Sequence, residues 1–203
     1  MRGVYLVTPN WDDTARLLDV TEQALREGVA LLQYRHKNAD EALRREQAAA
    51  LRLLTCKYGV PFIVNDFLAL CEEVDADGMH VGGTDISVAE ARSRLGKNKL
   101  VGASCYGDLA LARAAKEQGA SYMAFGGFYP SLVKQYPVTT DPDIVVQAKR
   151  EIDLPCVVIG GMTPENAAPL AARGADMVAA ISSVYLATAP DIAVQKFNQL
   201  FAG

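Results

Sequence analysis

Three polar side chains alternate at the end of a short apolar run near the N-terminus. Gln33, Arg35 and Lys37 are interleaved with Tyr34 and His36. Because successive side chains of an extended strand point to opposite faces, the first three share one face and the other two share the opposite face. Two cations and an amide on one face suit a phosphate or diphosphate. Solvated charges at the rim of the fold are the alternative interpretation for Arg35 and Lys37.

Carboxylates follow the next two apolar runs along the chain. Asn65 and Asp66 end one of these runs, and Asp85 comes shortly after the other. Neighbouring parallel strands lie about 4.8 Å apart, so the two aspartates are expected to reach one cation. Two carboxylates with substrate phosphate oxygens form a usual Mg²⁺ site. Either aspartate alone is also a good N-cap for the helix after it, but the pair beside two cations favours the metal.

A serine and a long loop follow the next two apolar runs. Ser104 ends the first, and the loop from Gly126 to about residue 141 follows the second. The loop contains Ser131 and Lys134, and loops of this length often act as lids. We expect Lys134 to close over a bound anion, with a plain surface lysine as the alternative.

Glycines and hydroxyls end the last two runs. Gly160 and Gly161 follow one, and Ile181 and Ser182 follow the other. Backbone N–H groups at such positions attract phosphate, and glycine lets an anion approach the backbone closely. A tight strand-to-helix turn would also explain the glycines. Together with the cationic group, these residues predict two anion sites, which would fit two phosphorylated substrates or one bisphosphate.

The elements that must position these residues alternate regularly. Short apolar runs predict eight buried strands, at residues 3–8, 30–35, 61–64, 78–81, 100–103, 122–125, 156–159 and 177–180. Segments with a period near 3.6 predict helices at residues 13–27, 40–58, 87–95, 108–118, 143–152, 164–173 and 191–201, with a short one after Asp66. Strands that are apolar on both faces and alternate with helices indicate a parallel sheet. We therefore predict a single α/β domain over residues 1–203, a (β/α)8 TIM barrel, rather than an open sheet, because no G-x-G-x-x-G follows the first strand.

Glycines near the predicted helix ends support this segmentation. Five predicted helices are followed by a glycine before the next strand, at Gly28, Gly59, Gly96, Gly119 and Gly174. Glycine is favoured there because it adopts the left-handed conformation that ends a helix.

Composition limits the class of protein. The 203 residues are 50% hydrophobic and 22% charged, with a net charge of −4, which argues against general nucleic-acid binding. The four cysteines form no C-x-x-C pair and lie in apolar stretches, so we expect small core residues. The first residues have too short an apolar stretch for a signal peptide or a membrane span, which indicates a cytoplasmic protein without a membrane partner. Barrels of this size often form homodimers.

The motifs in their order along the chain resemble the thiamine-phosphate synthase family. They are Gln33-x-Arg35-x-Lys37, Asn65-Asp66, Asp77-Gly78-x-His80-x-Gly82-x-x-Asp85, Gly102-x-Ser104, Gly126 to Lys134, Ile159-Gly160-Gly161 and Ile181-Ser182. The resemblance covers nearly the whole chain, and the shared order of the motifs on strand ends is specific.

The resemblance implies a reaction and a role for each residue. The family joins a pyrimidine diphosphate to a thiazole phosphate and releases pyrophosphate, with Mg²⁺ as cofactor. Gln33, Arg35, Asn65, Ser104 and Lys134 would hold the pyrimidine diphosphate, with Lys37 near its phosphates. Asp66 and Asp85 would bind magnesium, and Ser131 would contact pyrophosphate or the thiazole substrate. Gly161, Ile181 and Ser182 would hold the thiazole phosphate.

The sequence also departs from the family pattern. Phe67 stands where arginine is usual, Gly83 where glutamine is frequent, Tyr106 where histidine is frequent, and Val133 where a hydroxyl is frequent. Two other functions are the alternatives. One is the related thiazole tautomerase, which typically has a histidine where Gly127 stands, and the other is a non-catalytic binder of phosphorylated ligands.

Overall fold

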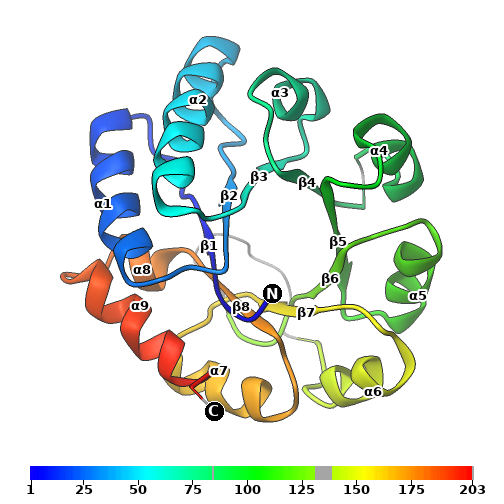
Figure 1. The fold of residues 1–203 in the computed structure, drawn as a ribbon. Coiled ribbons are helices and arrows are strands. Elements are labelled where there is room, and N and C mark those ends of the chain that lie inside the picture. The colour runs from blue at the N-terminus through cyan, green and yellow to red at the C-terminus, as the bar shows by residue number, and fades with distance from the viewer. Residues whose placement is uncertain (84, 131–138, 203) are drawn as a thin grey trace.

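The strands are almost entirely buried, as their apolar sequences predict. The computed structural model describes residues 1–83, 85–130 and 139–202. Its strands are β1 (Gly3–Val7), β2 (Leu31–Tyr34), β3 (Phe62–Asn65), β4 (Gly78–Val81), β5 (Leu100–Tyr106), β6 (Tyr122–Phe125), β7 (Cys156–Ile159) and β8 (Met177–Ala180). Each strand pairs in parallel with the next, and β8 pairs with β1, which closes the barrel (Figure 1). The predicted (β/α)8 barrel is therefore confirmed.

Helices surround the barrel on its outside. They are α1 (Thr14–Arg26), α2 (Glu41–Tyr58), α3 (Leu68–Glu73), α4 (Val88–Leu95), α5 (Leu109–Glu117), α6 (Ile144–Glu151), α7 (Pro164–Ala172), α8 (Ser182–Tyr185) and α9 (Pro190–Gln199). Side chains cap several of them, including Asp13 on α1, Asp40 on α2 and Ser87 on α4. Among the described helices, none is both long enough and apolar enough to cross a membrane.

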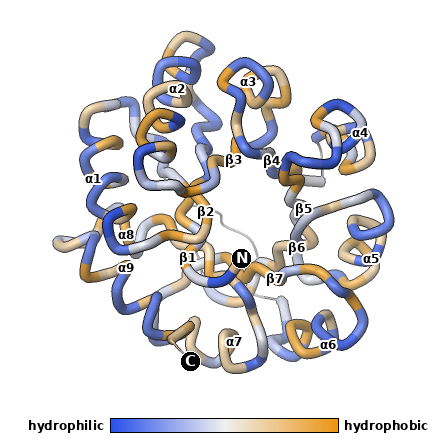
Figure 2. The backbone as a smooth tube through the Cα atoms, viewed as in Figure 1, coloured by the Kyte–Doolittle hydropathy of each residue, from blue (hydrophilic) through white to orange (hydrophobic). Residues whose placement is uncertain are grey.

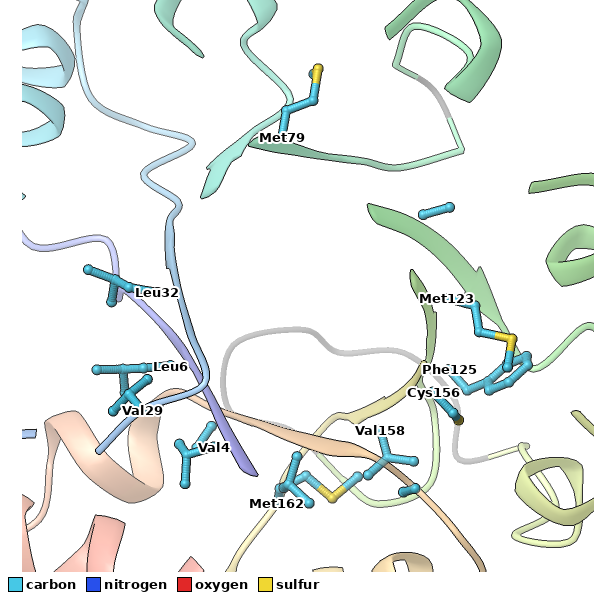
Figure 3. Close-up of a cluster of buried hydrophobic side chains, with 14 of the residues drawn as sticks. Val4, Leu6, Val29, Leu32, Met79, Met123, Phe125, Cys156, Val158 and Met162 are labelled. Atoms are coloured by element: carbon cyan, nitrogen blue, oxygen red, sulfur yellow. The ribbon is translucent and has the colours of Figure 1, made fainter. Parts of the chain in front are cut away.

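The buried apolar side chains form two layers, one on each side of the strands. The outer layer packs the strands against the helices, and Leu6, Leu32, Met79 and Phe125 belong to it (Figure 3). The inner layer fills the barrel and contains side chains such as Tyr5, Leu31, Ile63, Tyr122 and Met177. Figure 2 shows the same division along the chain, with apolar strands and helices that carry polar residues. Alternation along each strand therefore decides whether a side chain faces the helices or the barrel interior.

Two elements differ from the predicted ones. Strand β5 continues to Tyr106, three residues beyond the predicted end at 103, because an irregularity between Ser104 and Tyr106 lets it keep pairing with β6. The short helix α8 directly after β8 was not among the predicted helices. The prediction for the cysteines also needs correction: Cys71, Cys105 and Cys156 are buried, but Cys56 on α2 is exposed.

Glycine ends the helices as predicted. All five glycines singled out from the sequence have positive φ, between 65° at Gly59 and 104° at Gly174. A side chain would be strained at these positions.

Candidate active site

The end of β2 places its polar side chains on two faces. Gln33 and Arg35 are buried and line a recess inside the barrel. The hydroxyl of Thr8 accepts from the Arg35 backbone N–H at 2.8 Å and fixes the chain at this point. On the opposite face, Tyr34 donates to Gln47 on α2, and His36 lies 2.9 Å from Asp12. The predicted alternation is confirmed, and it directs the amide and the guanidinium into the barrel.

Lys37, Asp66 and Asp85 come together at the rim. The Lys37 ammonium lies 3.2 Å from an Asp66 carboxylate oxygen, and the Asp66 and Asp85 side chains are hydrogen-bonded to each other. Asp85 also accepts from the Gly82 backbone N–H at 2.8 Å. The N-caps of the following helices are Phe67 and Ser87, so neither aspartate has the capping role that was its alternative interpretation.

The electrostatics of the aspartate pair favour a cation. Burial raises the pKa of the Asp66 carboxyl and the neighbouring Asp85 raises it further, while Lys37 opposes both effects. Two adjacent carboxylates share a site comfortably only when a proton or a cation neutralises them. Asp66 also has a φ of +63°, a conformation that non-glycine residues rarely adopt and that is often held at functional sites. The pair therefore fits a divalent metal, and no group of three or more metal-binding side chains occurs among the described residues.

A cavity of about 230 Å³ opens at the ends of β5 to β8. Its lining includes Gly161, Ile181 and Ser182, the residues predicted for the second anion site. Gly160 and Gly161 both have positive φ, of 109° and 61°, which turns the chain sharply after β7. At the start of α8, the Ser183 hydroxyl is buried and has no hydrogen-bond partner among the described residues. A hydroxyl in this state is available to a ligand, because an unpaired buried polar group is costly.

A smaller recess continues from this cavity into the barrel. It is lined by Gln33, Arg35, Asn65 and Ser104 of the predicted pyrimidine site, together with Tyr5 and His80. Ser104 and Ile181 line both spaces, so the two predicted anion sites adjoin. The cluster of Lys37 with the two aspartates is not part of the described lining and lies at the rim. Ser131, Val133 and Lys134 lie outside the described residues.

Tyr106 and Gly83 close the mouth between β4 and β5. The Tyr106 hydroxyl accepts from the Gly83 backbone N–H at 3.0 Å. A Cβ atom added at Gly83 would lie 3.0 Å from the same hydroxyl oxygen, which is closer than almost all real contacts. Tyr106 itself has a φ of +53°. Two of the departures from the family pattern are therefore one structural feature, in which the tyrosine occupies the space beside a residue without a side chain.

Three residues of the recess were not predicted from the sequence to have a role. They are Tyr5, Tyr122 and His80, and they hydrogen-bond in a series between Gln33 and Ser104. The signal available in the sequence was the position of the two tyrosines on inward faces of β1 and β6, where a buried hydroxyl needs a partner.

The comparisons with known proteins agree with the resemblance seen in the sequence. The family model described as "Thiamine monophosphate synthase" matches residues 4–184. A thiamine-phosphate synthase from Janthinobacterium sp. (strain Marseille) is 63% identical over 202 residues, with 100% of this chain and 98% of the relative covered. One from Thiobacillus denitrificans is 50% identical over 202 residues, with 98% and 95% covered.

Solved structures support the same conclusion. A thiamine phosphate pyrophosphorylase from Pyrococcus furiosus superimposes with a TM-score of 0.84 at 28% identity, with 98% of this chain and 94% of that chain covered. A 3-hexulose-6-phosphate synthase has a TM-score of 0.72 at 16% identity, with 98% and 99% covered, which shows a shared fold only.

Proposed function

This chain belongs to the thiamine-phosphate synthase family and is a transferase of thiamine biosynthesis, and from this we propose how its residues act on the two substrates. We propose that the enzyme joins a pyrimidine-methyl diphosphate to a thiazole phosphate, giving thiamine phosphate and pyrophosphate. The observation that carries this proposal is the meeting of two adjoining spaces at Ser104, each lined by one set of predicted residues.

The pyrimidine diphosphate binds in the recess inside the barrel. The amides of Gln33 and Asn65 are buried there and can pair with the polar edge of a pyrimidine ring. Arg35 lines the same recess and reaches the diphosphate, with Lys37 at the rim and Lys134 from the loop after β6. A guanidinium in a buried setting binds phosphate oxygens in a fixed geometry, which orients the substrate.

Asp66 and Asp85 are the residues that would hold Mg²⁺. The metal would take its remaining ligands from water and from diphosphate oxygens, as magnesium usually does. When bound, it supplies charge neutralisation to the diphosphate and so stabilises the leaving group. The 3.2 Å contact between Lys37 and Asp66 keeps a second cation beside the same oxygens.

The thiazole phosphate binds in the larger cavity. Gly161, Ile181 and Ser182 line it, and we assign them to the phosphate, with backbone N–H groups and the Ser182 hydroxyl as donors. The buried Ser183 hydroxyl is an additional donor at the same place. Ser131, in the loop between β6 and α6, is assigned to pyrophosphate or to the thiazole substrate.

The chemical step then runs between the two spaces. The bond between the pyrimidine methylene carbon and the diphosphate oxygen breaks, and its electron pair leaves with pyrophosphate. The lone pair of the thiazole nitrogen then forms the new carbon–nitrogen bond. The residues of this chain contribute by holding the two reactants in line and by stabilising the negative charge that develops on the leaving oxygen, chiefly through Arg35, Lys37, Ser104 and Lys134.

The direct test is product formation by the purified protein with both substrates and MgCl₂. We expect thiamine phosphate and pyrophosphate in equal amounts, and neither when one substrate is omitted. Arg35→Ala should lower kcat/KM by at least about tenfold, because it removes a charged partner of the diphosphate. Arg94→Ala is the matched control, since Arg94 is exposed on α4 and pairs with Glu72. Absence of product from the wild type, or an Arg35→Ala variant as active as Arg94→Ala, would contradict the proposal.

We further propose that residues 1–203 act as one catalytic domain in the cytoplasm, without nucleic-acid or membrane partners, and that two copies form a homodimer. The closed barrel uses both ends of the chain, because β1 pairs with β8. Light scattering of the purified protein tests the dimer directly, and a monomer mass at micromolar concentration would contradict it.

A further inference from the structure

A series of hydrogen bonds crosses the interior of the barrel. The Gln33 amide donates to the Tyr5 hydroxyl at 2.7 Å, and the hydroxyls of Tyr5 and Tyr122 lie 2.6 Å apart. Tyr122 lies 3.2 Å from Nδ1 of His80, and Nε2 of His80 lies 2.9 Å from the Ser104 hydroxyl. The series starts at one residue assigned to the pyrimidine diphosphate and ends at another.

Packing holds the middle of the series rigidly. The Tyr5 and Tyr122 rings meet edge to face with centroids 5.7 Å apart, and the His80 ring stacks on Tyr122 at the same separation. Gly102 makes room for Tyr122, since a Cβ atom at that position would lie 2.0 Å from the tyrosine ring. This explains the glycine of the Gly102-x-Ser104 motif: it lets the ring lie against β5, two residues before the serine.

The two tyrosines stay neutral over the physiological pH range. Both are fully buried, and burial raises the pKa of Tyr5 and of Tyr122 well above the ordinary value. Each hydroxyl therefore keeps its proton and must both donate and accept within the series.

The direction of the series follows from its two ends. The Gln33 amide nitrogen can only donate, so the Tyr5 hydroxyl receives that bond and gives its own proton to Tyr122. Tyr122 in turn donates to Nδ1 of His80, which places the histidine proton on Nε2. In the reverse direction the Tyr5 oxygen would receive two donors, and its own proton would have no acceptor among the described residues. A buried donor without a partner is costly, so the forward direction is favoured.

We infer that Tyr5, Tyr122 and His80 are positioning residues that orient Ser104. His80 donates through Nε2 to the serine oxygen, and the serine must then direct its own proton into the cavity, where the leaving oxygen or the pyrimidine edge is its acceptor. Hydrogen bonds that all run in one direction polarise one another, so the serine becomes a better donor than an isolated hydroxyl. The inference rests on the proposed function only in what it assigns to the Ser104 proton.

Nuclear magnetic resonance tests the series without any substrate. The chain has two histidines, so long-range ¹H–¹⁵N correlation spectra resolve both rings. We expect His80 in the Nε2–H tautomer in the wild type. Tyr122→Phe removes one hydroxyl and should shift the His80 ring nitrogens, while His36, whose Nδ1 accepts from the Ala39 N–H, should not change.

A matched control separates the series from general packing. Tyr34→Phe removes an equally buried hydroxyl, but one that faces α2 and donates to Gln47. It should leave the His80 resonances and the kinetics unchanged. Tyr5→Phe keeps the bond from Tyr122 to His80 and loses only the start of the series, so its effect on His80 should be smaller than that of Tyr122→Phe. It also serves as the test if Tyr122→Phe does not fold.

Kinetics give the second readout. Tyr122→Phe should lower kcat by about tenfold with little change in KM, because an oriented donor acts chiefly on the developing charge. An Nδ1–H tautomer in the wild type, or unchanged His80 signals in Tyr122→Phe, would overturn the inference. Lack of activity in the wild type would instead overturn the proposed function, and the NMR result would still stand.

Discussion

Asp66 combines several features that a structural aspartate would avoid. It has a positive φ, it is partly buried, and its side chain meets another carboxylate. Its pKa is raised in the folded state, so the protonated form favours folding, and this stability is lost as the pH rises through the folded pKa. At neutral pH without metal, the ionised Asp66 therefore costs stability, and a bound cation would remove that cost.

Thermal unfolding checks this role of Asp66. A ligand at 100 times its Kd stabilises the folded state by about 2.7 kcal/mol, which corresponds to roughly 5–10 °C in a chain of this size. MgCl₂ should therefore raise the Tm of the wild type by about this amount at pH 7. Asp66→Asn should show no such rise and should melt at or above the metal-free wild type, because asparagine tolerates positive φ and carries no charge. Equal magnesium responses in the two proteins would remove Asp66 from the metal site.

Gly161 illustrates why a substitution at a glycine is a poor test of a phosphate site. A Cβ atom there would lie 2.0 Å from the Pro130 carbonyl oxygen, and φ is +61°. Gly161→Val would therefore disturb the turn and the loop before it, whatever it does to the phosphate.

Ser182 offers a cleaner test of the same site. Ser182→Ala removes one hydroxyl from the cavity wall and adds no atoms. A hydrogen bond to a charged group contributes about 1.5–3 kcal/mol, so KM for the thiazole phosphate should rise by about tenfold or more. KM for the pyrimidine diphosphate is the internal control and should stay near the wild-type value. Steady-state kinetics with each substrate varied in turn decide this, and equal rises for both substrates would argue against two separate sites.

Single residues also show where reasoning from sequence stops. Alternation on β2 was enough to place Gln33 and Arg35 inside the barrel. The series through Tyr5, Tyr122 and His80 was not found, because its members come from β1, β6 and β4, and their contacts depend on barrel register. Three residues far apart in sequence show no local spacing pattern.

At the level of elements, the strand ends matter more than the strands. Periodicity located all eight strands because each is apolar on both faces. It ended β5 too early, since Ser104 and Tyr106 interrupt the apolar pattern while the backbone keeps pairing with β6. It missed α8 because four residues are too few to show a helical period. Both errors fall at the candidate site, where polar function replaces the regular pattern.

The connection between β6 and α6 carries the next prediction. We propose that Lys134 acts on the departing pyrophosphate, where negative charge builds only as the bond breaks. Lys134→Ala should lower kcat by a factor of roughly 100 to 1,000 with a smaller effect on substrate affinity, and Lys134→Arg should recover part of the loss. Single-turnover rates measure this step.

Lys97 provides the control for that experiment. It is exposed in the connection from α4 to β5, which lies at the opposite end of the barrel from the strand ends that carry the site. Lys97→Ala should react like the wild type. An unchanged chemical step in Lys134→Ala would exclude that lysine from the mechanism.

For the whole molecule, closure of the barrel ties the two ends of the chain together. Strand β1 pairs with β8, and α9 packs against both α1 and β1. Loss of contacts in the last helix should therefore destabilise the whole barrel rather than the C-terminus alone.

Phe197 tests this cooperativity. It is fully buried on α9, and Phe197→Ala should cost about 3–5 kcal/mol of unfolding free energy. The single tryptophan, Trp11, lies in the loop after β1 and packs against Tyr185, so its fluorescence reports on a distant region. Urea curves from fluorescence and circular dichroism should shift together. Leu53→Ala, on the exposed face of α2, should leave both curves unchanged, and a fluorescence midpoint that does not move in Phe197→Ala would contradict the prediction.

The contact between Gly83 and Tyr106 limits how this enzyme can diverge from its relatives. The tyrosine hydroxyl occupies the space that a side chain at position 83 would need, so a long residue there is compatible only with a different residue at position 106. A lineage that changes one position alone passes through an intermediate with a steric clash or an unfilled gap at the mouth of the barrel. The two positions therefore evolve as a pair, and the frequent glutamine and histidine of the family are the other solution to the same packing problem.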